Sequence, residues 1–351
     1  MHLGTLIHVS DLHIGRLDDV SGDADAFRLW AYSRAFHGLL GHEYRALVLL
    51  ERFASQYDGS KRQRLLRLIV SGDLTRVGHD DEFSMAVQYR DDVANFGDQR
   101  KLGLRLSKEQ LSIPGNHDRW PGRSTIWGGP MPGFEEAFPQ GRRPYWDDCE
   151  TLASGHMLRF IGIDTDADVS AWGQRRFLAR GAFLSQLDIL SSKLPVMEHS
   201  EIRVLIMHHS PAHKGHVLGL QQASRDALAD FVEDHGIAVV LTGHMHAPRI
   251  GVDSFSFSRP PVHRLEARCG TTSVRRTLPY SWKKFMKRPV GRHDDNTLLV
   301  HDLTLDKEEV IWTSTTYLQT PMGFVDPRKL NTQADPRKLR NLVSSFRAWP
   351  L

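Results

Sequence analysis

Short apolar runs that end in polar clusters recur as far as about residue 250, and this pattern restricts the possible folds more than any other feature of the sequence. We predict that six such runs are buried strands, with longer segments of helical periodicity between them. The predicted strands cover residues 3–9, 65–70, 111–113, 157–163, 202–207 and 237–241. Strands that alternate with helices are typical of α/β proteins.

Helical periodicity covers residues 80–95 and 221–234, and residues 24–57 are predicted to form two helical pieces that separate near Gly38 and Gly41. From about residue 250 the apolar residues alternate with polar ones, and Asp306-Lys307-Glu308 predicts a hairpin turn within residues 296–316. The last part of the sheet is therefore not expected to be parallel.

Two segments are predicted to lie outside this regular structure. Residues 119–147 are rich in Gly, Pro and Trp, and a loop of this length inside a compact domain is usually functional or disordered. Its aromatic residues favour an ordered loop near a site. A lid over a site is its simpler role, and an anchor for a protein partner is the alternative. A tail over residues 319–351 repeats Asp-Pro-Arg-Lys-Leu at 326–330 and 335–339, and two copies are too few for a repeat fold.

Composition excludes several classes of protein. No run of eighteen apolar residues could span a bilayer, and no apolar stretch is long enough for a secretory signal. The two cysteines, Cys149 and Cys269, cannot form a disulfide framework or a four-thiolate zinc site. These observations predict a protein that does not contact membranes and that works in the reducing cytoplasm.

The C-terminal part of the chain is basic. Residues 259–351 hold 17 Lys and Arg against 9 Asp and Glu, whereas residues 1–258 hold 28 against 33. Residues 275–292 contain three aromatic residues, no acidic residue, and the basic residues Arg275, Arg276, Lys283, Lys284, Lys287, Arg288 and Arg292. Such a segment could bind a nucleic-acid strand. The alternative, which we favour, is a solvated loop whose side-chain stems lie on the protein.

Five polar clusters of Asp, Asn and His stand at the ends of predicted strands. They are Asp11-Leu12-His13, Gly72-Asp73, Gly115-Asn116-His117-Asp118, His208-His209 and Gly243-His244-Met245-His246. Each cluster alone has an ordinary explanation as a turn or as a hydrogen-bonded structural residue. Because the carboxyl ends of strands in an open α/β sheet converge on one crevice, the five clusters together favour one site for two metal ions.

The residue types suit cations that share one phosphate. Two ions about 3.5 to 4 Å apart can bind a phosphoryl group and a nucleophilic water together. An anion must lie between such ions, and Asp73 is the candidate bridge. Asp11 and His13 lie two residues apart on an extended segment and so project to the same side, as do His244 and His246. Carboxylate, amide and imidazole ligands suit Mn, Fe, Zn or Co better than Ca or Mg.

The ordered series D-x-H, G-D, G-N-H-D, H and G-H-x-H resembles that of the calcineurin-like metallophosphoesterases. The residues in and around these motifs are most similar to those of the branch related to class III cyclic nucleotide phosphodiesterases. The phrases are Gly72-Asp-Leu-Thr75, Ile113-Pro-Gly-Asn-His-Asp118, Ala179-Arg-Gly-Ala-Phe-Leu184, Met207-His-His-Ser-Pro211, Gly243-His-Met-His-Ala-Pro248 and Gly270-Thr-Thr-Ser273. The resemblance implies a catalytic domain over residues 1–318, built as a four-layer αββα sandwich of two mixed β-sheets flanked by helices.

The resemblance also implies the roles of individual residues. The expected ligands of one metal are Asp11, His13 and His246, and those of the other are Asn116, His208 and His244, with Asp73 between the two. His117 would protonate the leaving ester oxygen or stabilise its charge, and Asp118 is a candidate for orienting that imidazole.

Two positions stay open. Many relatives have an acidic residue three positions after the bridging aspartate, where this chain has Arg76. Arg76 is either a contact for a substrate phosphate or a solvated surface residue. In the His208-His209 pair the motif favours His208 as the ligand, because it follows the strand directly. His209 is then a supporting residue or a substrate-binding one.

The sequence thus predicts a metal-dependent hydrolase of phosphoric esters with two transition-metal ions, most simply Mn, Fe or Zn. We favour a phosphodiesterase for a small phosphodiester, acting by direct attack of a metal-bridging hydroxide while His117 assists the leaving group. The alternatives are a nuclease for single-stranded or damaged nucleic acid, a phosphomonoesterase, and a metal-binding interaction protein without activity.

Overall fold

The computed structural model describes residues 1–15, 39–60, 64–76, 78–96, 101–119, 133–138, 145–169, 180–212, 219–254, 263–277, 296–329 and 343–347. Several predictions fall wholly or mostly outside these residues. They concern the first helical piece before residue 39, most of the loop over 119–147, most of the basic segment 275–292 and the second Asp-Pro-Arg-Lys-Leu copy.

The first sheet combines parallel and antiparallel strands in the order β16-β15-β14-β1-β3-β6, and β17 also pairs with β15. Its strands are β1 (His2–Val9), β3 (Leu65–Ser71), β6 (Gln110–Ile113), β14 (Thr297–Asp306), β15 (Glu309–Thr320), β16 (Gly323–Val325) and β17 (Val343–Arg347). β1, β3 and β6 are parallel, whereas β14 is antiparallel to β1 and to β15. The predicted hairpin turn is confirmed, and Lys307 in it has a left-handed φ of 57°.

The second sheet has the order β11-β12-β10-β9-β8-β7. Its strands are β7 (Tyr145–Thr151), β8 (Met157–Ile163), β9 (Glu201–Ile206), β10 (Ile237–Thr242), β11 (Arg249–Ser254) and β12 (His263–Arg268). The four central strands are parallel, and the edge strands β7 and β11 are antiparallel to their neighbours. Two small ribbons join β2 (Leu39–His42) to β13 (Val274–Thr277) and β4 (Ala94–Asn95) to β5 (Lys101–Leu102).

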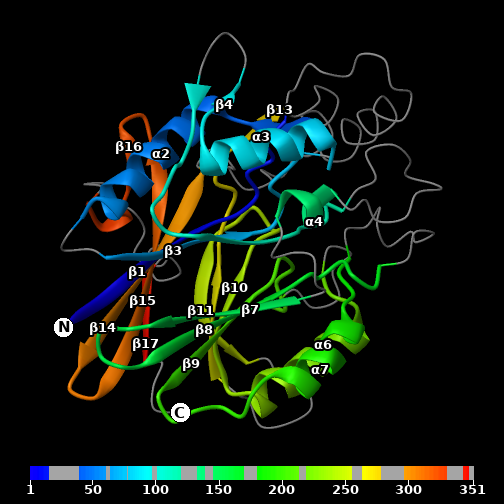
Figure 1. The fold of residues 1–351 in the computed structure, drawn as a ribbon, viewed down its shortest axis with the longest axis vertical. Coiled ribbons are helices and arrows are strands. Elements are labelled where there is room, and N and C mark those ends of the chain that lie inside the picture. Colours follow the sequence, from blue (N-terminus) through cyan, green and yellow to red (C-terminus); the bar gives the residue numbers. More distant parts are fainter. Residues whose placement is uncertain are drawn as a thin grey trace, which may run out of the picture.

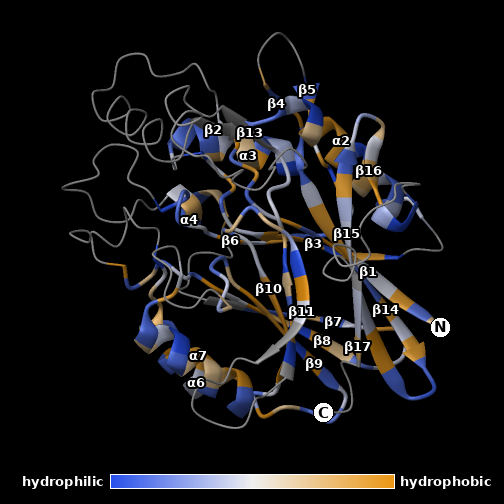
Figure 2. Ribbon diagram, turned by 180° about the vertical axis from the view of Figure 1, so that it is seen from behind, coloured by the Kyte–Doolittle hydropathy of each residue, from blue (hydrophilic) through white to orange (hydrophobic). Residues whose placement is uncertain are grey.

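Helices cover the outer faces of both sheets (Figure 1). They are α2 (Tyr44–Asp58), α3 (Asp80–Asp91), α4 (Gly133–Ala137), α6 (Leu184–Lys193) and α7 (Gln222–Asp234), with a short 3-10 helix, η2, at Pro327–Lys329. Figure 2 shows both hydrophobic and hydrophilic residues along α6 and α7, as expected for helices that bury one face. None of the described helices is both long enough and apolar enough to cross a bilayer.

The apolar residues form three layers of core, which define the four-layer sandwich. Strand β9 shows how its sequence builds two of them, because successive side chains of a strand point to opposite faces. Val204 and Ile206 belong to the core between the sheets, whereas Leu205 packs with α6 and α7. A third core, which includes Leu50 of α2 and Val70 of β3, lies outside the first sheet. The predicted αββα sandwich of two mixed sheets is confirmed.

Differences from the prediction are confined to ends and loops. The helix predicted over residues 80–95 ends at Asp91, because Ala94–Asn95 pairs with Lys101–Leu102 instead. Residues 39–42 are a strand, and within the predicted loop Gly133–Ala137 is helical and β7 begins at Tyr145. The division at residue 318 stays a prediction; β15 runs through it, and both β16 and β17 pair with β15.

Candidate metal centre

The five polar clusters meet where the parallel strands of both sheets end. In the first sheet they follow β1, β3 and β6, which are neighbours, and in the second sheet they follow β9 and β10, which are also neighbours. The carboxyl ends of these strands therefore deliver their side chains to one place between the sheets. The expected ligands are all buried apart from His246, whose side chain is 15% exposed.

Three groups of ligand-type side chains lie close enough to hold cations. Within each group the candidate atoms lie within 4.8 Å of one another. The groups are Asp11, His13 and His246; His13, Asp73 and His117; and Asp73, His208 and His244. Because the groups share His13 and Asp73, they form one continuous cluster.

Asp73 occupies the middle of this cluster. Its Oδ2 atom lies 3.2 Å from Nε2 of His208 and 3.8 Å from Nε2 of His13. Its Oδ1 atom accepts a hydrogen bond of 2.9 Å from the backbone N–H of His117. One oxygen of the carboxylate therefore faces imidazoles that come from both sheets. This is the position that the sequence predicts for a bridging ligand.

Several lone pairs converge around His208. Its Nδ1 atom lies 2.7 Å from the carbonyl oxygen of Ser71, which only accepts, so Nδ1 carries the proton of the neutral ring. Nε2 then directs its lone pair toward Asp73, and it also lies 3.2 Å from Oδ1 of Asn116 and 3.3 Å from Nδ1 of His244. Lone pairs this close repel one another unless a cation or a proton lies among them.

Other buried ligand atoms in the cluster are unsatisfied. Neither ring nitrogen of His13 has a hydrogen-bond partner, and neither does Nε2 of His244. Oδ1 of Asp11 makes no hydrogen bond and lies 3.1 Å from Nε2 of His246. Buried polar atoms without partners cost free energy, commonly about 1 to 3 kcal/mol each. Bound metal ions would satisfy them, so the donor set fits a metal centre.

Burial and neighbouring charges control the protonation of the cluster. Burial lowers the pKa of His13 to about 3 and the pKa of His244 well below its ordinary value, so both rings are neutral and able to coordinate. Burial disfavours a charge on His208 as well, but the carboxylate of Asp73 raises the pKa of His208 to about 10, so without a metal ion a proton on Nε2 takes the place of a cation beside Asp73. The cluster therefore attracts positive charge to the space beside Asp73.

Five of the expected ligands have a left-handed backbone. Their φ angles lie between 47° and 68°, and the residues are Asp11, His13, Asp73, His244 and His246. This region costs a non-glycine residue of order 1 to 3 kcal/mol and is enriched at functional sites. Among the described residues, the other non-glycine positions with positive φ are Arg105 and Lys307.

Residues 270–273 hold the loop that carries Asp11 and His13. The backbone N–H of Thr272 donates to the carbonyl of Ser10 at 3.0 Å, and the hydroxyl of Thr271 donates to the carbonyl of Asp11 at 3.1 Å. The hydroxyl of Ser273 donates to the carbonyl of Leu12 at 2.6 Å. The sequence marked this segment only by resemblance, and the structure shows that it fixes the ligand-bearing loop.

Glycine is required next to two of the ligands. Gly72 has a φ of 98°, and a Cβ atom there would strike the ring of His208 and lie 2.9 Å from the Cα atom of Gly115. A Cβ atom at Gly115 would strike the carboxylate of Asp73. These glycines allow the loops after β3 and β6 to approach each other, which brings Asp73 beside Asn116.

His117 and Asp118 have separate surroundings. Nδ1 of His117 lies 2.7 Å from the carbonyl oxygen of Arg76, which leaves Nε2 without the proton in the neutral ring. The carboxylate of Asp118 accepts hydrogen bonds of 2.8 to 3.1 Å from the backbone N–H groups of Leu74, Thr75 and Gly115 and from the hydroxyl of Thr75. The expected contact of Asp118 with the imidazole is thus replaced by that of the Arg76 carbonyl.

The side chains of Arg76 and His209 are both occupied by protein groups. Nε of Arg76 donates to Oε1 of the buried Glu82 at 3.1 Å, and the Arg76 side chain is only 13% exposed. His209 is fully buried, its ring centroid lies 4.2 Å from that of His244, and its Nδ1 atom lies 2.6 Å from Oγ1 of Thr165. Neither alternative that the sequence left for Arg76, a solvated residue or a phosphate contact, anticipated this ion pair.

Sequence reasoning missed the residues that follow β8. Oδ2 of Asp166 lies 3.9 Å from Nδ1 of His209 and has no hydrogen-bond partner. Burial, together with the charge of Asp164, raises the pKa of Asp166 to about 7. Asp164 in turn binds Arg119 at 2.6 Å. The signal was present, because Asp164-Thr165-Asp166 stands at the end of a predicted strand, as the five chosen clusters do.

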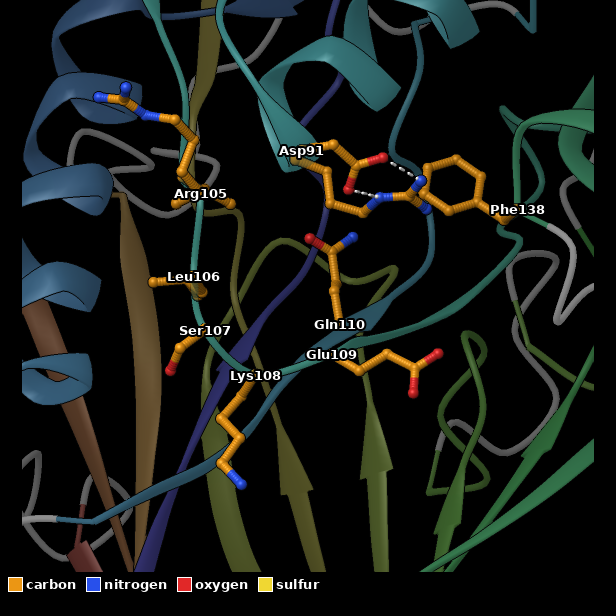
Figure 3. A pocket seen from close by; sticks show the side chains of 10 residues that line it. Asp91, Arg105, Leu106, Ser107, Lys108, Glu109, Gln110 and Phe138 are labelled. Atoms are coloured by element: carbon orange, nitrogen blue, oxygen red, sulfur yellow. Dashed lines mark hydrogen bonds and ion pairs between the residues drawn. The ribbon is translucent and has the colours of Figure 1, made fainter.

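A separate hollow of about 520 Å³ opens at the start of β6 (Figure 3). Residues 104–110 line one side of it, and Arg90, Asp91 and Phe138 line the other. Arg90 binds Asp91 through two contacts of 2.5 Å and lies 4.8 Å from the ring centroid of Phe138. None of the cluster residues lines this hollow, since they follow the opposite end of β6.

A family model decides the assignment of the chain. The model for calcineurin-like phosphoesterases matches residues 4–248, a range that contains all five clusters. The chain belongs to the calcineurin-like phosphoesterase family. The resemblance to the calcineurin-like family drawn from the sequence is thereby confirmed, and a metal-dependent phosphoester hydrolase is the activity that this family suggests.

The solved structures to which this phosphoesterase is similar share little sequence with it. Purple acid phosphatase PPD1 from yellow lupin (Lupinus luteus) seeds is 12% identical, with a TM-score of 0.50 over 92% of this chain and 53% of that chain. This chain therefore spans about half the length of the lupin protein. GAP50, the anchor in the inner membrane complex of Plasmodium, is 12% identical, with a TM-score of 0.49 over 99% of this chain and 89% of that chain. No curated protein sequence matches this phosphoesterase. At this identity the likeness to the lupin enzyme shows a shared fold, not a shared activity.

Proposed function

We propose that this phosphoesterase is a phosphodiesterase that depends on two transition-metal ions. The observation that carries the proposal is the convergence of lone pairs on Asp73. A buried carboxylate faces His13 from one side and His208 from the other, while Asn116 and His244 add further donor atoms beside His208. Without a cation, this carboxylate would be buried beside ring nitrogens of His13 and His244 that have no hydrogen-bond partner, which is costly.

The donor groups divide naturally into two sets that share Asp73. The proposed first set is Asp11, His13, Asp73 and His246, and the proposed second set is Asp73, Asn116, His208 and His244. Mn, Fe and Zn all suit such nitrogen and oxygen donors. When bound, a pair of such ions supplies Lewis acidity for the phosphate and lowers the pKa of water enough to give a nucleophile near neutral pH.

The chain itself supplies the groups that support this chemistry. His117 is held by its Nδ1 contact with the Arg76 carbonyl, which leaves Nε2 as the ring nitrogen for proton exchange, so we assign it to the leaving ester oxygen. We assign Asp118 a positioning role, because its four hydrogen bonds join the loops after β3 and β6. We likewise assign Arg76 and His209 to support of the site, since their ion pair and burial withhold them from a substrate.

We prefer a small phosphodiester as the substrate because the sequence segments around the motifs resemble those of the class III branch. A nuclease activity is the second candidate, and one observation favours it. The basic segment 275–292 begins in β13, which follows directly on the residues 270–273 that hold the Asp11 loop. A nucleic-acid strand bound at β13, where the segment begins, would therefore approach the metal centre. The proposed cytoplasmic location rests on cysteine usage alone.

An assay on metal-depleted protein tests the activity. The protein is reloaded with Mn²⁺ and given bis(p-nitrophenyl) phosphate, p-nitrophenyl phosphate, cyclic AMP and a single-stranded DNA oligonucleotide. We expect hydrolysis of a small diester with a higher kcat/KM than that of the monoester, and none without metal. A faster monoester reaction contradicts the proposal, whereas DNA cleavage that falls steeply with salt supports the nuclease. When variants of the metal centre are assayed, Lys108→Gln, in the hollow of Figure 3, serves as the control substitution.

A further inference from the structure

A second group of buried histidines lies outside the proposed metal ligands. His8 is on β1, His301 is on the neighbouring β14, and both side chains are fully buried. Their rings stack with centroids 5.6 Å apart, and Nε2 of His301 lies 3.5 Å from Nδ1 of His8. Burial lowers the pKa of His301 to about 3 and the pKa of His8 well below its ordinary value, so both rings are neutral. A neutral imidazole has one N–H donor and one acceptor nitrogen. When one nitrogen of a ring accepts a hydrogen bond, the other nitrogen must therefore donate to the next group.

Trp312 on β15 indicates which nitrogen of His301 accepts and which one donates. Its indole N–H, which can only donate, lies 3.3 Å from Nδ1 of His301 and 3.1 Å from Oγ of Ser314. Ser314 Oγ itself lies 2.7 Å from the same Nδ1 atom. If Nδ1 carried a proton, two N–H groups would face each other at 3.3 Å. The indole bond to His301 requires Nδ1 of His301 to accept, and in that tautomer the Nε2–H of His301 donates to Nδ1 of His8.

The chain of bonds ends at β3, the strand that precedes Asp73. With Nδ1 accepting, His8 has its proton on Nε2, which lies 2.8 Å from Oγ of Ser71. Ser71 is the last residue of β3, two positions before Asp73. Its hydroxyl faces the histidine chain, while its carbonyl accepts the Nδ1–H of His208 at 2.7 Å. One residue thus links the buried histidines to a proposed ligand.

We propose that His8, oriented by His301 and Trp312, is a positioning residue that fixes Ser71 and through it the ring of His208 and the placement of Asp73. The inference rests on the proposed metal centre. Groups that orient a metal ligand without touching the metal typically contribute about 10-fold to 100-fold to metal affinity. Here the orienting group is a chain of hydrogen bonds that crosses four strands, and it begins on β15, remote in sequence from every ligand.

The direction of these hydrogen bonds depends on which nitrogen of each ring carries the proton. This is measured directly by ¹⁵N NMR of the histidine rings in the folded wild-type protein at pH 7. The expected spectrum shows both His8 and His301 as the tautomer protonated on Nε2. A spectrum with either ring protonated on Nδ1 overturns the proposed chain. This measurement needs no substitution and does not depend on metal.

The functional link is measured as Mn²⁺ affinity and as kcat in variants. His8→Phe fills the space but removes the donor, and Ser71→Ala removes only the hydroxyl that receives it. We expect each to weaken Mn²⁺ binding by at least about 10-fold and to lower kcat with little change in KM. His8→Gln places an amide N–H near the Nε2 position and should recover most of the affinity, which a purely structural role would not predict.

Thr316→Val is the matched control, because Thr316 is buried on β15 and its hydroxyl has no hydrogen-bond partner. It should bind Mn²⁺ as the wild type does. Wild-type affinity and kcat in both His8→Phe and Ser71→Ala would overturn the positioning role while leaving the metal centre intact. If His8→Phe does not fold, Ser71→Ala decides the question. A wild-type protein that binds no Mn²⁺ would instead overturn the proposed function.

Discussion

Nδ1 of His117 lies 2.7 Å from the carbonyl oxygen of Arg76, so the backbone at one predicted site residue fixes the ring of another. The sequence raised Arg76 as a departure, since many relatives carry an acidic side chain at that position. In this chain the carbonyl of the same residue supplies an acceptor for the histidine, and the side chain binds Glu82. The orientation of the imidazole is thus independent of which side chain stands at position 76.

His117→Ala should separate leaving-group assistance from metal binding. The variant should keep its metal content, because we place His117 outside both ligand sets. Loss of a positioned general acid typically costs about 100-fold to 10,000-fold in rate. We expect kcat to fall most for esters with poor leaving groups and least for p-nitrophenyl esters. A variant that loses its metal would show that His117 is a ligand.

Asp73→Asn should remove the charge that both proposed sites share. The neutral amide cannot balance two cations, so the variant should bind less than two ions per chain and show no detectable turnover. Metal analysis after gel filtration, paired with the diester assay, checks both effects. Full metal content with normal kcat would be inconsistent with a bridging carboxylate.

Arg76→Ala should reduce stability rather than substrate binding. The Arg76 side chain is 13% exposed and the Glu82 side chain only 3%, so the variant removes an ion pair of a buried carboxylate. Such losses cost about 3 kcal/mol. Urea unfolding should show this decrease, while KM for the diester stays unchanged. A KM raised more than about 10-fold at unaltered stability would identify Arg76 as a phosphate contact.

Acid should destabilise the metal-free protein partly through His301. Burial lowers the pKa of His301 to about 3, whereas the unfolded chain has a histidine pKa of about 6.5. Between these values the unfolded state binds a proton that the folded state excludes, so stability falls as the pH falls. From pH 7 to pH 5 one such histidine contributes a loss of about 2 kcal/mol. Urea unfolding of His301→Gln should show a smaller pH dependence than that of the wild type. Equal dependence in both proteins would mean that His301 is protonated in the folded state.

Much of the fold was predictable because its strands are short apolar runs with polar ends. Leu65–Ser71 and Ile237–Thr242 are fully buried, and such runs are typical of parallel strands with both faces covered. The polar residues after them then converged as the topology requires. Gly41 shows the limit of this reasoning, since a segment with a glycine near its end formed a strand by pairing with β13.

The supporting groups of the site could not be predicted from local sequence. Asp118 stands beside His117 in the chain, yet its carboxylate binds the loop after β3, because that loop offers two backbone N–H groups and a hydroxyl. The left-handed backbone at Asp11 and His13 depends on hydrogen bonds from residues 271–273, which are remote in sequence. Such conformations are stabilised by tertiary contacts rather than by residue type.

Anomalous diffraction from a crystal soaked in Mn²⁺ tests the metal centre most directly. The proposed ligand sets predict two peaks on either side of Asp73, one beside Asp11, His13 and His246 and the other beside Asn116, His208 and His244. A single peak away from Asp73, or no peak at a Mn²⁺ concentration that supports full activity, would contradict the proposed centre.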